Sequence, residues 1–212
     1  MQSTVLETVS QTSPIIAETE ENGTKNGGVK LHKWTQKEYY QMAELGFFHG
    51  KRAELIKGEI IEMSLMKSAH ATALGLAAQI LARIFFENFI VRTQMPMSFS
   101  NANAPETDAA VIKGSLRDFA NSHPKTAELI VEVSDSTLRY DRTVKVGLYA
   151  QNKIREYWIL NLKKRCLEVY RQPKKDKKLD FIYSEIKILT EDDRVSPLAA
   201  PNAKIVIADL LP

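Results

Sequence analysis

The chain has 212 residues, of which 44% are hydrophobic and 26% charged, which is ordinary for a soluble globular protein and enough for one domain with a full core. The formal net charge of +3 is too small to indicate nucleic-acid binding by itself, although a local basic patch would suffice for it. The single cysteine, Cys166, excludes an internal disulfide and a cysteine-based zinc site. The apolar runs are too short to span a bilayer and the N-terminus has no secretory signal, so we expect a cytoplasmic protein without a membrane segment.

Residues 1–28 are rich in Ser, Thr, Glu, Asn and Gly, so they cannot bury enough apolar surface to offset their ordering. The sequence therefore predicts a disordered N-terminal tail over residues 1–28 and a folded domain over residues 29–212. In the domain, residues 34–46 favour a short helix that Thr35 caps and Gly46 ends. The stretch AELIKGEIIEMS, residues 53–64, predicts a β-hairpin that turns at Lys57 and Gly58.

Residues 70–88 give the clearest helix, because their apolar side chains repeat at helical spacing. Residues 89–100 predict one or two strands with a break or an edge at Pro96, and residues 107–112 predict a short strand.

Strand and helix then alternate toward the C-terminus. Residues 127–135 predict a buried strand, and residues 136–153 predict a turn that leads into a helix. Further strands are expected at 155–162, 166–173, 181–189 and 203–211, with the basic stretch KKDKK as a linker. This order favours an α/β fold with a central mixed β-sheet flanked by helices.

Two carboxylates and one ammonium stand where these strands and the following helix could bring them together. Asp108 opens the short strand, Glu132 lies inside the apolar strand LIVEV, and Lys145 follows in the helix. Two carboxylates on adjacent strands can converge on a hard divalent cation, and the carbonyl of Val133 offers a third oxygen. The alternative is structural: Asp108 caps a turn and Glu132 pairs with an arginine.

The stretches AELIKGEIIEMS, PETDAAVI and ELIVEVSDSTLRYDRTVKVGLYAQNKIREYWILNL resemble a large bacterial family of restriction-endonuclease-like proteins in the PD-(D/E)XK nuclease superfamily. The resemblance runs from about Trp34 to the C-terminus. It implies the restriction-endonuclease-like fold. It also implies that Asp108 and Glu132 are metal ligands. The chain departs from the family at Thr107, where a proline is usual.

The superfamily's lysine normally stands two residues after the second carboxylate, where this chain has Ser134. The resemblance implies that Lys145 takes its place from the following helix. Asp141 lies one helical turn before Lys145 and is expected to orient it. Glu54 matches an acidic residue that often lines the superfamily's site.

Three more residues are candidates around this site. His70 stands near a helix start, where it could approach a substrate phosphate or assist the site; the alternative is a cap or packing residue. Gln94 matches a position where the superfamily sometimes places a glutamine. Arg142, beside the proposed site, is a candidate phosphate contact.

The resemblance implies Mg²⁺-dependent hydrolysis of phosphodiester bonds in DNA, with Mn²⁺ as a substitute cation, and a homodimer because a duplex needs two cuts. Two alternatives stay open at this point. One is a catalytically silent module that binds nucleic acid or protein and retains the fold. The other is a nuclease directed at RNA.

Overall fold

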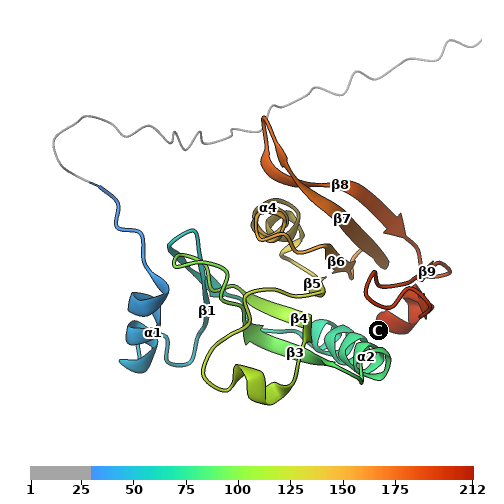
Figure 1. Ribbon diagram of the computed structural model, residues 1–212, viewed down its shortest axis with the longest axis horizontal. Helices are drawn as coiled ribbons and strands as arrows, with labels where there is room; N and C mark the ends of the chain where they lie inside the picture. Colours follow the sequence, from blue (N-terminus) through green and yellow to red (C-terminus); the bar gives the residue numbers. More distant parts are fainter. Residues whose placement is uncertain (1–29) are drawn as a thin grey trace, which may run out of the picture. The chain divides into compact units, whose positions relative to one another are not determined.

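A mixed β-sheet between two layers of helix forms the centre of the fold (Figure 1). The computed structural model describes residues 30–212, so the tail predicted for residues 1–28 lies outside the described residues. No helix in this range is long and apolar enough to cross a membrane. The helical elements are α1 (Gln36–Glu44), α2 (Ser68–Ile84), η1 (Leu116–Phe119), α3 (Leu138–Tyr140), η2 (Asp141–Lys145), α4 (Val146–Gln151) and η3 (Ile207–Leu210).

The strands fall into one large sheet and two small ones. Their bounds are β1 (Arg52–Ile56), β2 (Glu59–Met63), β3 (Phe89–Pro96), β4 (Glu106–Lys113), β5 (Leu129–Ser134), β6 (Glu156–Asn161), β7 (Cys166–Asp176), β8 (Asp180–Leu189), β9 (Arg194–Val195) and β10 (Ile205–Val206). The six-stranded sheet has the order β3-β4-β5-β6-β7-β8. Its strands β5 and β6 run parallel and all other neighbours are antiparallel, which confirms the predicted mixed α/β fold.

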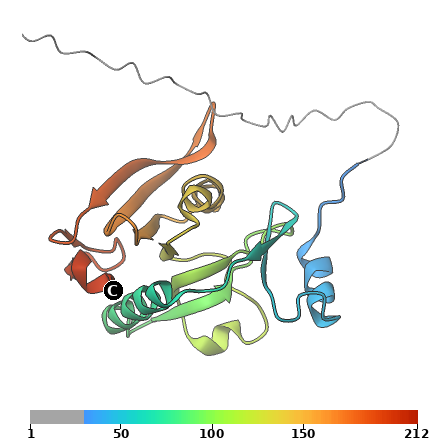
Figure 2. The ribbon, with the colours of Figure 1, turned by 180° about the vertical axis from the view of Figure 1, so that it is seen from behind.

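The two faces of this sheet bury different side chains because successive residues of a strand point to opposite sides. On one face, Val131 and Trp158 pack with α2 and with the C-terminal residues around η3. Both ribbon views place the C-terminus beside α2 (Figures 1 and 2). On the other face, Ile130 and Tyr157 pack with Leu148 of α4. Residue Glu132 alternates with Val131 and therefore points to the α4 face.

The crossover from β5 to β6 carries α3, η2 and α4, because parallel neighbours need a long connection. The sequence predicts a single helix here, and the structure differs in one respect. Residues Asp141–Lys145 form a π-helical turn between two α-helical pieces. Both Asp141 and Lys145 are buried in this turn.

The N-terminal elements follow the sequence prediction closely. Thr35 caps α1 in a capping box with Glu38, and the β1–β2 hairpin turns at Lys57 and Gly58, which both have positive φ. Ala104 forms a β-bridge with Leu55 and thereby ties the hairpin to the segment that leads into β4.

Two C-terminal expectations are wrong in detail. The strand predicted for residues 203–211 is limited to Ile205–Val206, after which η3 buries Ile207 and Leu210. Ile207 and Leu210 are three residues apart, which is a helical spacing, so the apolar residues of this stretch serve a short strand and then a short helix. The stretch KKDKK is likewise no separate linker, because β7 continues to Asp176 and pairs with β8.

The tight turn of the β1–β2 hairpin gives a matched test of how Lys33 packs on Gly58. Gly58 has φ +74°, and a Cβ there would lie 2.8 Å from Lys33 Cβ, whereas Gly46 has φ +84° with nothing within 4 Å. We expect Gly46→Ala to cost about 1–2 kcal/mol from backbone strain alone. Gly58→Ala should cost more in urea unfolding, because it adds the clash, and equal losses would contradict the packing of Lys33 on the turn.

Candidate functional site

The pairing of β4 with β5 stops where the two predicted carboxylates stand. The register runs through Ala109 and Val131 and goes no further toward Asp108. Beyond it, the Asp108 carboxylate takes the place of a main-chain acceptor, because its Oδ2 accepts the Val133 N–H at 2.8 Å. In return, Glu132 Oε2 accepts the Asp108 N–H at 3.4 Å. The side chains of Asp108 and Glu132 therefore close the gap between two diverging strands.

His70, in the first turn of α2, completes the surroundings of Asp108. Its Nε2 lies 3.1 Å from Asp108 Oδ1. Burial acts to raise the pKa of Asp108, but the hydrogen bond and charge of His70, aided by Lys145, lower it below its ordinary value. His70 therefore contacts a carboxylate of the site, and its expected approach to a phosphate stays a prediction.

Lys145 reaches Glu132 from the helical layer. Its Nζ lies 3.0 Å from Glu132 Oε1 and donates to the Glu106 carbonyl at 3.2 Å. Tyr149, one turn further along, donates its hydroxyl to the same Glu132 oxygen at 2.5 Å. The structure thus brings together Asp108, Glu132 and Lys145 as the sequence predicts, and it adds Tyr149.

Glu54 lies behind Lys145, fully buried in β1. Its Oε2 is 3.6 Å from Lys145 Nζ and accepts the Glu106 N–H at 3.1 Å, while its Oε1 accepts the Tyr140 hydroxyl at 3.1 Å. The side chain therefore belongs to the buried cluster and does not line the pocket described below.

The charges of this cluster do not balance. Burial lowers the pKa of Lys145, but the attraction of four carboxylates, with Glu132 first and Glu54 next, raises it well above its ordinary value. The ammonium is therefore charged. Burial raises the pKa of Glu132 well above its ordinary value, and although Lys145 opposes this, Asp108 adds to it. Burial also raises the pKa of Asp141. Four acidic groups around one ammonium are the surroundings of an additional cation.

A pocket of about 280 Å³ opens onto this cluster. Its polar lining includes Asp108, Glu132, Val133, Lys145, His70, Asp141, Glu106 and Arg52. Arg52 of β1 forms an ion pair with Glu106 at the pocket wall. The pocket is thus acidic at its centre.

The free lone pairs of the two carboxylates fit a divalent cation. Each oxygen of Asp108 accepts one hydrogen bond and keeps a lone pair, whereas Glu132 Oε1 is saturated by Lys145 and Tyr149 and leaves Oε2 for a ligand role. The Val133 N–H faces Asp108, and the carbonyl of an extended residue points to the same side as its N–H. In the described part of the chain, no three His, Cys, Asp or Glu side chains group as metal ligands. The residues therefore fit a cation held by two carboxylates, one carbonyl and water.

Asp141 and Arg142 make other contacts than the sequence predicts. Asp141 accepts from Thr137 at 2.6 Å, so the contacts that orient Lys145 come from Glu132, Glu54 and the Glu106 carbonyl. Arg142 forms a bidentate pair with Glu168 at 2.8 and 2.6 Å and does not line the pocket.

Gln94 stands opposite Asp108 between two register pairs of β3 and β4, with φ 51°. Its Nε2 is buried and has no hydrogen-bond partner among residues 30–212, and the side chain does not line the pocket. The structure places Gln94 beside the site without showing a contact for it.

Neither Tyr149 nor Tyr140 is among the site residues predicted from the sequence, although their hydroxyls hold Glu132 and Glu54. A phenol at the inner face of the predicted helix was the available signal. Tyr149 follows Lys145 by one turn, so both side chains fall on the face that covers Glu132.

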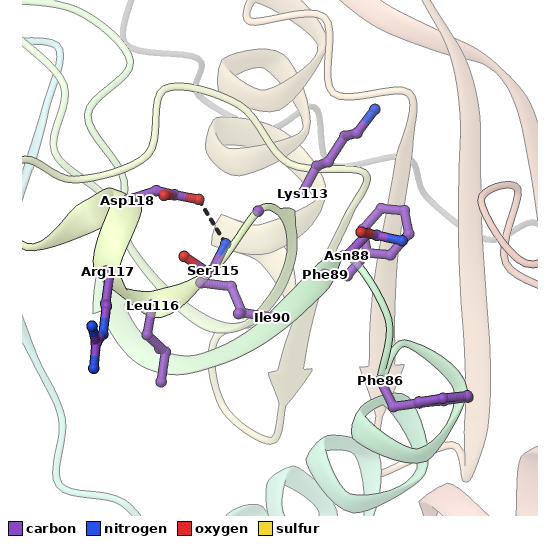
Figure 3. A pocket seen from close by; sticks show the side chains of 10 residues that line it. Phe86, Asn88, Phe89, Ile90, Lys113, Ser115, Leu116, Arg117 and Asp118 are labelled. Atoms are coloured by element: carbon purple, nitrogen blue, oxygen red, sulfur yellow. Dashed lines mark hydrogen bonds between the residues drawn. The ribbon is translucent and has the colours of Figure 1, made fainter.

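A larger hollow of about 730 Å³ lies elsewhere, at the ends of β3 and β4 (Figure 3). Its one carboxylate, Asp118, accepts the Ser115 N–H at 2.8 Å. Phe86 and Leu116 are exposed there beside Lys113 and Arg117. Among residues 30–212, no group of acidic side chains lines this hollow, whereas Asp108 and Glu132 line the smaller pocket.

Comparisons with known proteins identify the family of this chain and a similar fold. A family model described as "Uma2: Putative restriction endonuclease" matches residues 36–208. The fold is similar to the crystal structure of a "putative nuclease belonging to DUF820" from Anabaena variabilis ATCC 29413, with a TM-score of 0.64, 14% identity, and coverage of 83% of this chain and 96% of that one. The type IIG restriction endonuclease BpuSI aligns over 56% of this chain and 14% of its own, with 16% identity and a TM-score of 0.35. Among curated proteins, none matches this sequence.

The buried charge of Lys145 gives a stability test in metal-free buffer. Lys145→Met leaves Glu132 and Glu54 without their ammonium, so we expect a loss of about 3–5 kcal/mol at pH 8 by urea unfolding in EDTA. Because the folded-state pKa of Glu132 is raised, its contribution to stability falls as pH rises above the unfolded value. The variant should therefore lose less as the pH is lowered toward 5, because protonation of Glu132 removes the unpaired charge.

The control for this test is Lys187→Met, whose partner Glu185 is near the surface. That exposed pair should contribute no more than about 1 kcal/mol at either pH. A Lys145→Met loss as small as the control's, or one that does not change with pH, would show that the cluster is not charged as described.

Proposed function

The chain belongs to the Uma2 family, whose description is "Putative restriction endonuclease", and we propose that the pocket at the divergence of β4 and β5 hydrolyses phosphodiester bonds in DNA with the help of Mg²⁺. The observation that carries the proposal is the excess of acidic groups around Lys145, with free lone pairs on Asp108 and Glu132 facing one pocket. DNA as the substrate rests on the family's description as restriction endonucleases.

In this proposal Asp108, Glu132 Oε2 and the Val133 carbonyl hold the Mg²⁺, and Mn²⁺ is an acceptable substitute. The cation supplies charge that polarises the phosphate and makes a bound water a better nucleophile. The residues of the chain provide the rest. His70 and the Val133 N–H fix the Asp108 carboxylate, and the diverging strands hold both carboxylates at one edge.

Lys145 acts as a charged donor in this mechanism. Its raised pKa keeps the ammonium protonated, so it cannot accept a proton from water while the carboxylates keep their charge. It holds Glu132 Oε1 and turns Oε2 toward Asp108. It also lines the pocket, where its charge stabilises negative charge that develops on the phosphate.

Ser134 explains how Lys145 comes to this position. Its side chain points to the same sheet face as Glu132, two residues further along β5, and it is buried under the turn that carries Asp141. A small residue leaves room for that turn to pack on the strand. The ammonium therefore arrives from the helical layer at the place that the superfamily usually fills from the strand.

The first test is cleavage. Purified protein with Mg²⁺ or Mn²⁺ should cut DNA, and Asp108→Ala should abolish cutting because one of the two carboxylates is lost. Duplex, single-stranded and branched DNA, and RNA, should be offered in parallel with both metals. Wild-type protein that leaves every substrate intact would contradict the proposed activity.

A thermal shift separates the nuclease from a silent binding module. A ligand that binds the folded state stabilises it by about 2.7 kcal/mol at a hundred times its Kd, so Mn²⁺ should raise the Tm of the wild type. Asp108→Ala should show no such rise, whereas Lys187→Met should keep it. No Mn²⁺ response in the wild type would favour the binding module.

The homodimer stays a proposal based on the two cuts that a duplex needs. Sedimentation of the wild type in the presence of uncut DNA and Ca²⁺ would show it as two chains per duplex. One chain per duplex would contradict it.

A further inference from the structure

Arg92 of β3 is a buried arginine without an acidic partner. Arg92 is 8% exposed, and none of the ion pairs within residues 30–212 includes it. Its Nε lies 3.3 Å from Met95 Sδ, its Nη2 lies 3.3 Å from His123 Nδ1, and its Nη1 is buried with no hydrogen-bond partner there. An uncompensated buried charge is costly, so the arrangement suits an anionic ligand.

The partners of Arg92 differ from those of Lys145. Arg92 and Lys145 are the two buried cationic residues in the described range. Lys145 has carboxylates at 3.0 and 3.6 Å, whereas Arg92 has a sulfur, a neutral ring nitrogen and the face of Phe119, whose centroid is 5.9 Å away. Burial lowers the pKa of Arg92, and the neighbouring Tyr40 hydroxyl opposes this without reversing it.

His123 contacts the Arg92 guanidinium and also lines a hollow. An arginine side chain only donates hydrogen bonds, so His123 Nδ1 must accept, and the proton of the neutral ring then lies on Nε2. Burial, together with the charge of Arg92, lowers the pKa of His123 and favours this neutral ring. Within residues 30–212, the hydrogen bond of the His123 ring is the one through Nδ1, and the ring lines the hollow. Its N–H is therefore a donor available to a ligand.

The hollow has a volume of about 440 Å³ and lies between α1 and the loop after η1. Tyr40, whose ring stacks on His123 at 5.9 Å, contributes a hydroxyl that is buried and unpartnered within residues 30–212. Burial raises the pKa of Tyr40, so this hydroxyl keeps its proton and can donate. Among the described residues that line the hollow, none is acidic, and Phe119 adds an aromatic wall.

We propose that this hollow, the Arg92 pocket (Tyr40, Phe119 and His123, with Arg92 behind them), binds a phosphate group of a nucleic-acid strand. His123 Nε2–H and the Tyr40 hydroxyl are its direct donors, and Arg92 supplies the counter-charge through His123 Nδ1. Rings of this kind also accept a stacked base beside the phosphate.

The sheet register places Arg92 near Asp108, which lines the pocket proposed to hold the metal. Arg92 pairs with Ala110, so the two side chains share a sheet face, and Asp108 lies two residues further along the same strand. Strand geometry therefore separates the Cα atoms of Arg92 and Asp108 by about 8 Å. A strand whose phosphate is hydrolysed at Asp108 can place a neighbouring phosphate near Arg92. The nucleic-acid source of the phosphate rests on the proposed function, but the phosphate site itself does not.

The first experiment uses inorganic phosphate and thermal unfolding, in EDTA and at constant ionic strength set with chloride. Phosphate should raise the Tm of the wild type and of Arg117→Met, whose guanidinium comes from the neighbouring η1 helix. Arg92→Met should lose that rise and, without phosphate, should be no less stable than the wild type. His123→Phe keeps the stacked ring, removes the Nε2 donor, and should also lose the response.

Equal phosphate responses in the wild type, Arg92→Met and His123→Phe would overturn the site. So would a large loss of stability in phosphate-free Arg92→Met, because it would mean that the guanidinium is already compensated. If His123→Phe kept the phosphate response while Arg92→Met lost it, Arg92 would not act on the phosphate through His123.

The second experiment identifies the source of the phosphate. In the cleavage-silent Asp108→Ala background, a single-stranded oligonucleotide should bind about tenfold more weakly after Arg92→Met, as expected for one charge-assisted contact. The slope of log affinity against log salt should fall by about 0.7 for one phosphate on a single strand. A deoxynucleoside monophosphate that responds to Arg92→Met while the oligonucleotide does not would overturn the strand as the source. Because no cleavage is measured, an inactive wild type leaves both experiments decisive.

Discussion

The attraction between one buried ammonium and the carboxylates around it is the interaction on which the site depends. Lys145 holds Glu132 and Glu54 together, and these two residues come from the central sheet and from a separate hairpin. The ammonium offsets part of their charge and leaves an excess that raises the pKa of Glu132 and Asp141. Such a cluster is unfavourable by itself and becomes favourable when a cation joins it. The proposed metal binding rests on this local charge imbalance.

The π-helical turn makes this arrangement possible. Residues Asp141–Lys145 are wound more widely than an α-helix, which brings two charged residues of one turn into the buried face over Ser134. Such turns interrupt helices at functional sites because they reorient side chains at a cost in regularity. Here the turn delivers the ammonium to Glu132 while Tyr149, further along in α4, adds a second donor to the same oxygen.

The sequence predicts the parts of this molecule that depend on local patterns. The hairpin follows from Lys57 and Gly58, the α1 helix from its cap, and the metal-site carboxylates from acidic residues in apolar strands. The position of Lys145 depended on a family resemblance, because spacing alone does not tell which helix face meets a strand. Partners set by sheet register were out of reach: Arg142 pairs with Glu168 of β7, a strand 26 residues away in the chain. The prediction for the C-terminal residues was wrong for another reason, because a few apolar residues suit a strand and a short helix equally.

The central claim is that Asp108 and Glu132 hold one divalent cation at the divergence of β4 and β5. Anomalous diffraction from crystals grown with Mn²⁺ tests it most directly, because Mn²⁺ is seen without reference to activity. We predict an anomalous peak within ligand distance, about 2.0–2.6 Å, of oxygens from Asp108, Glu132 and the Val133 carbonyl, with Lys145 still on Glu132. A fully metal-loaded crystal with no peak there, or with Lys145 bridging both carboxylates in its place, would contradict the account.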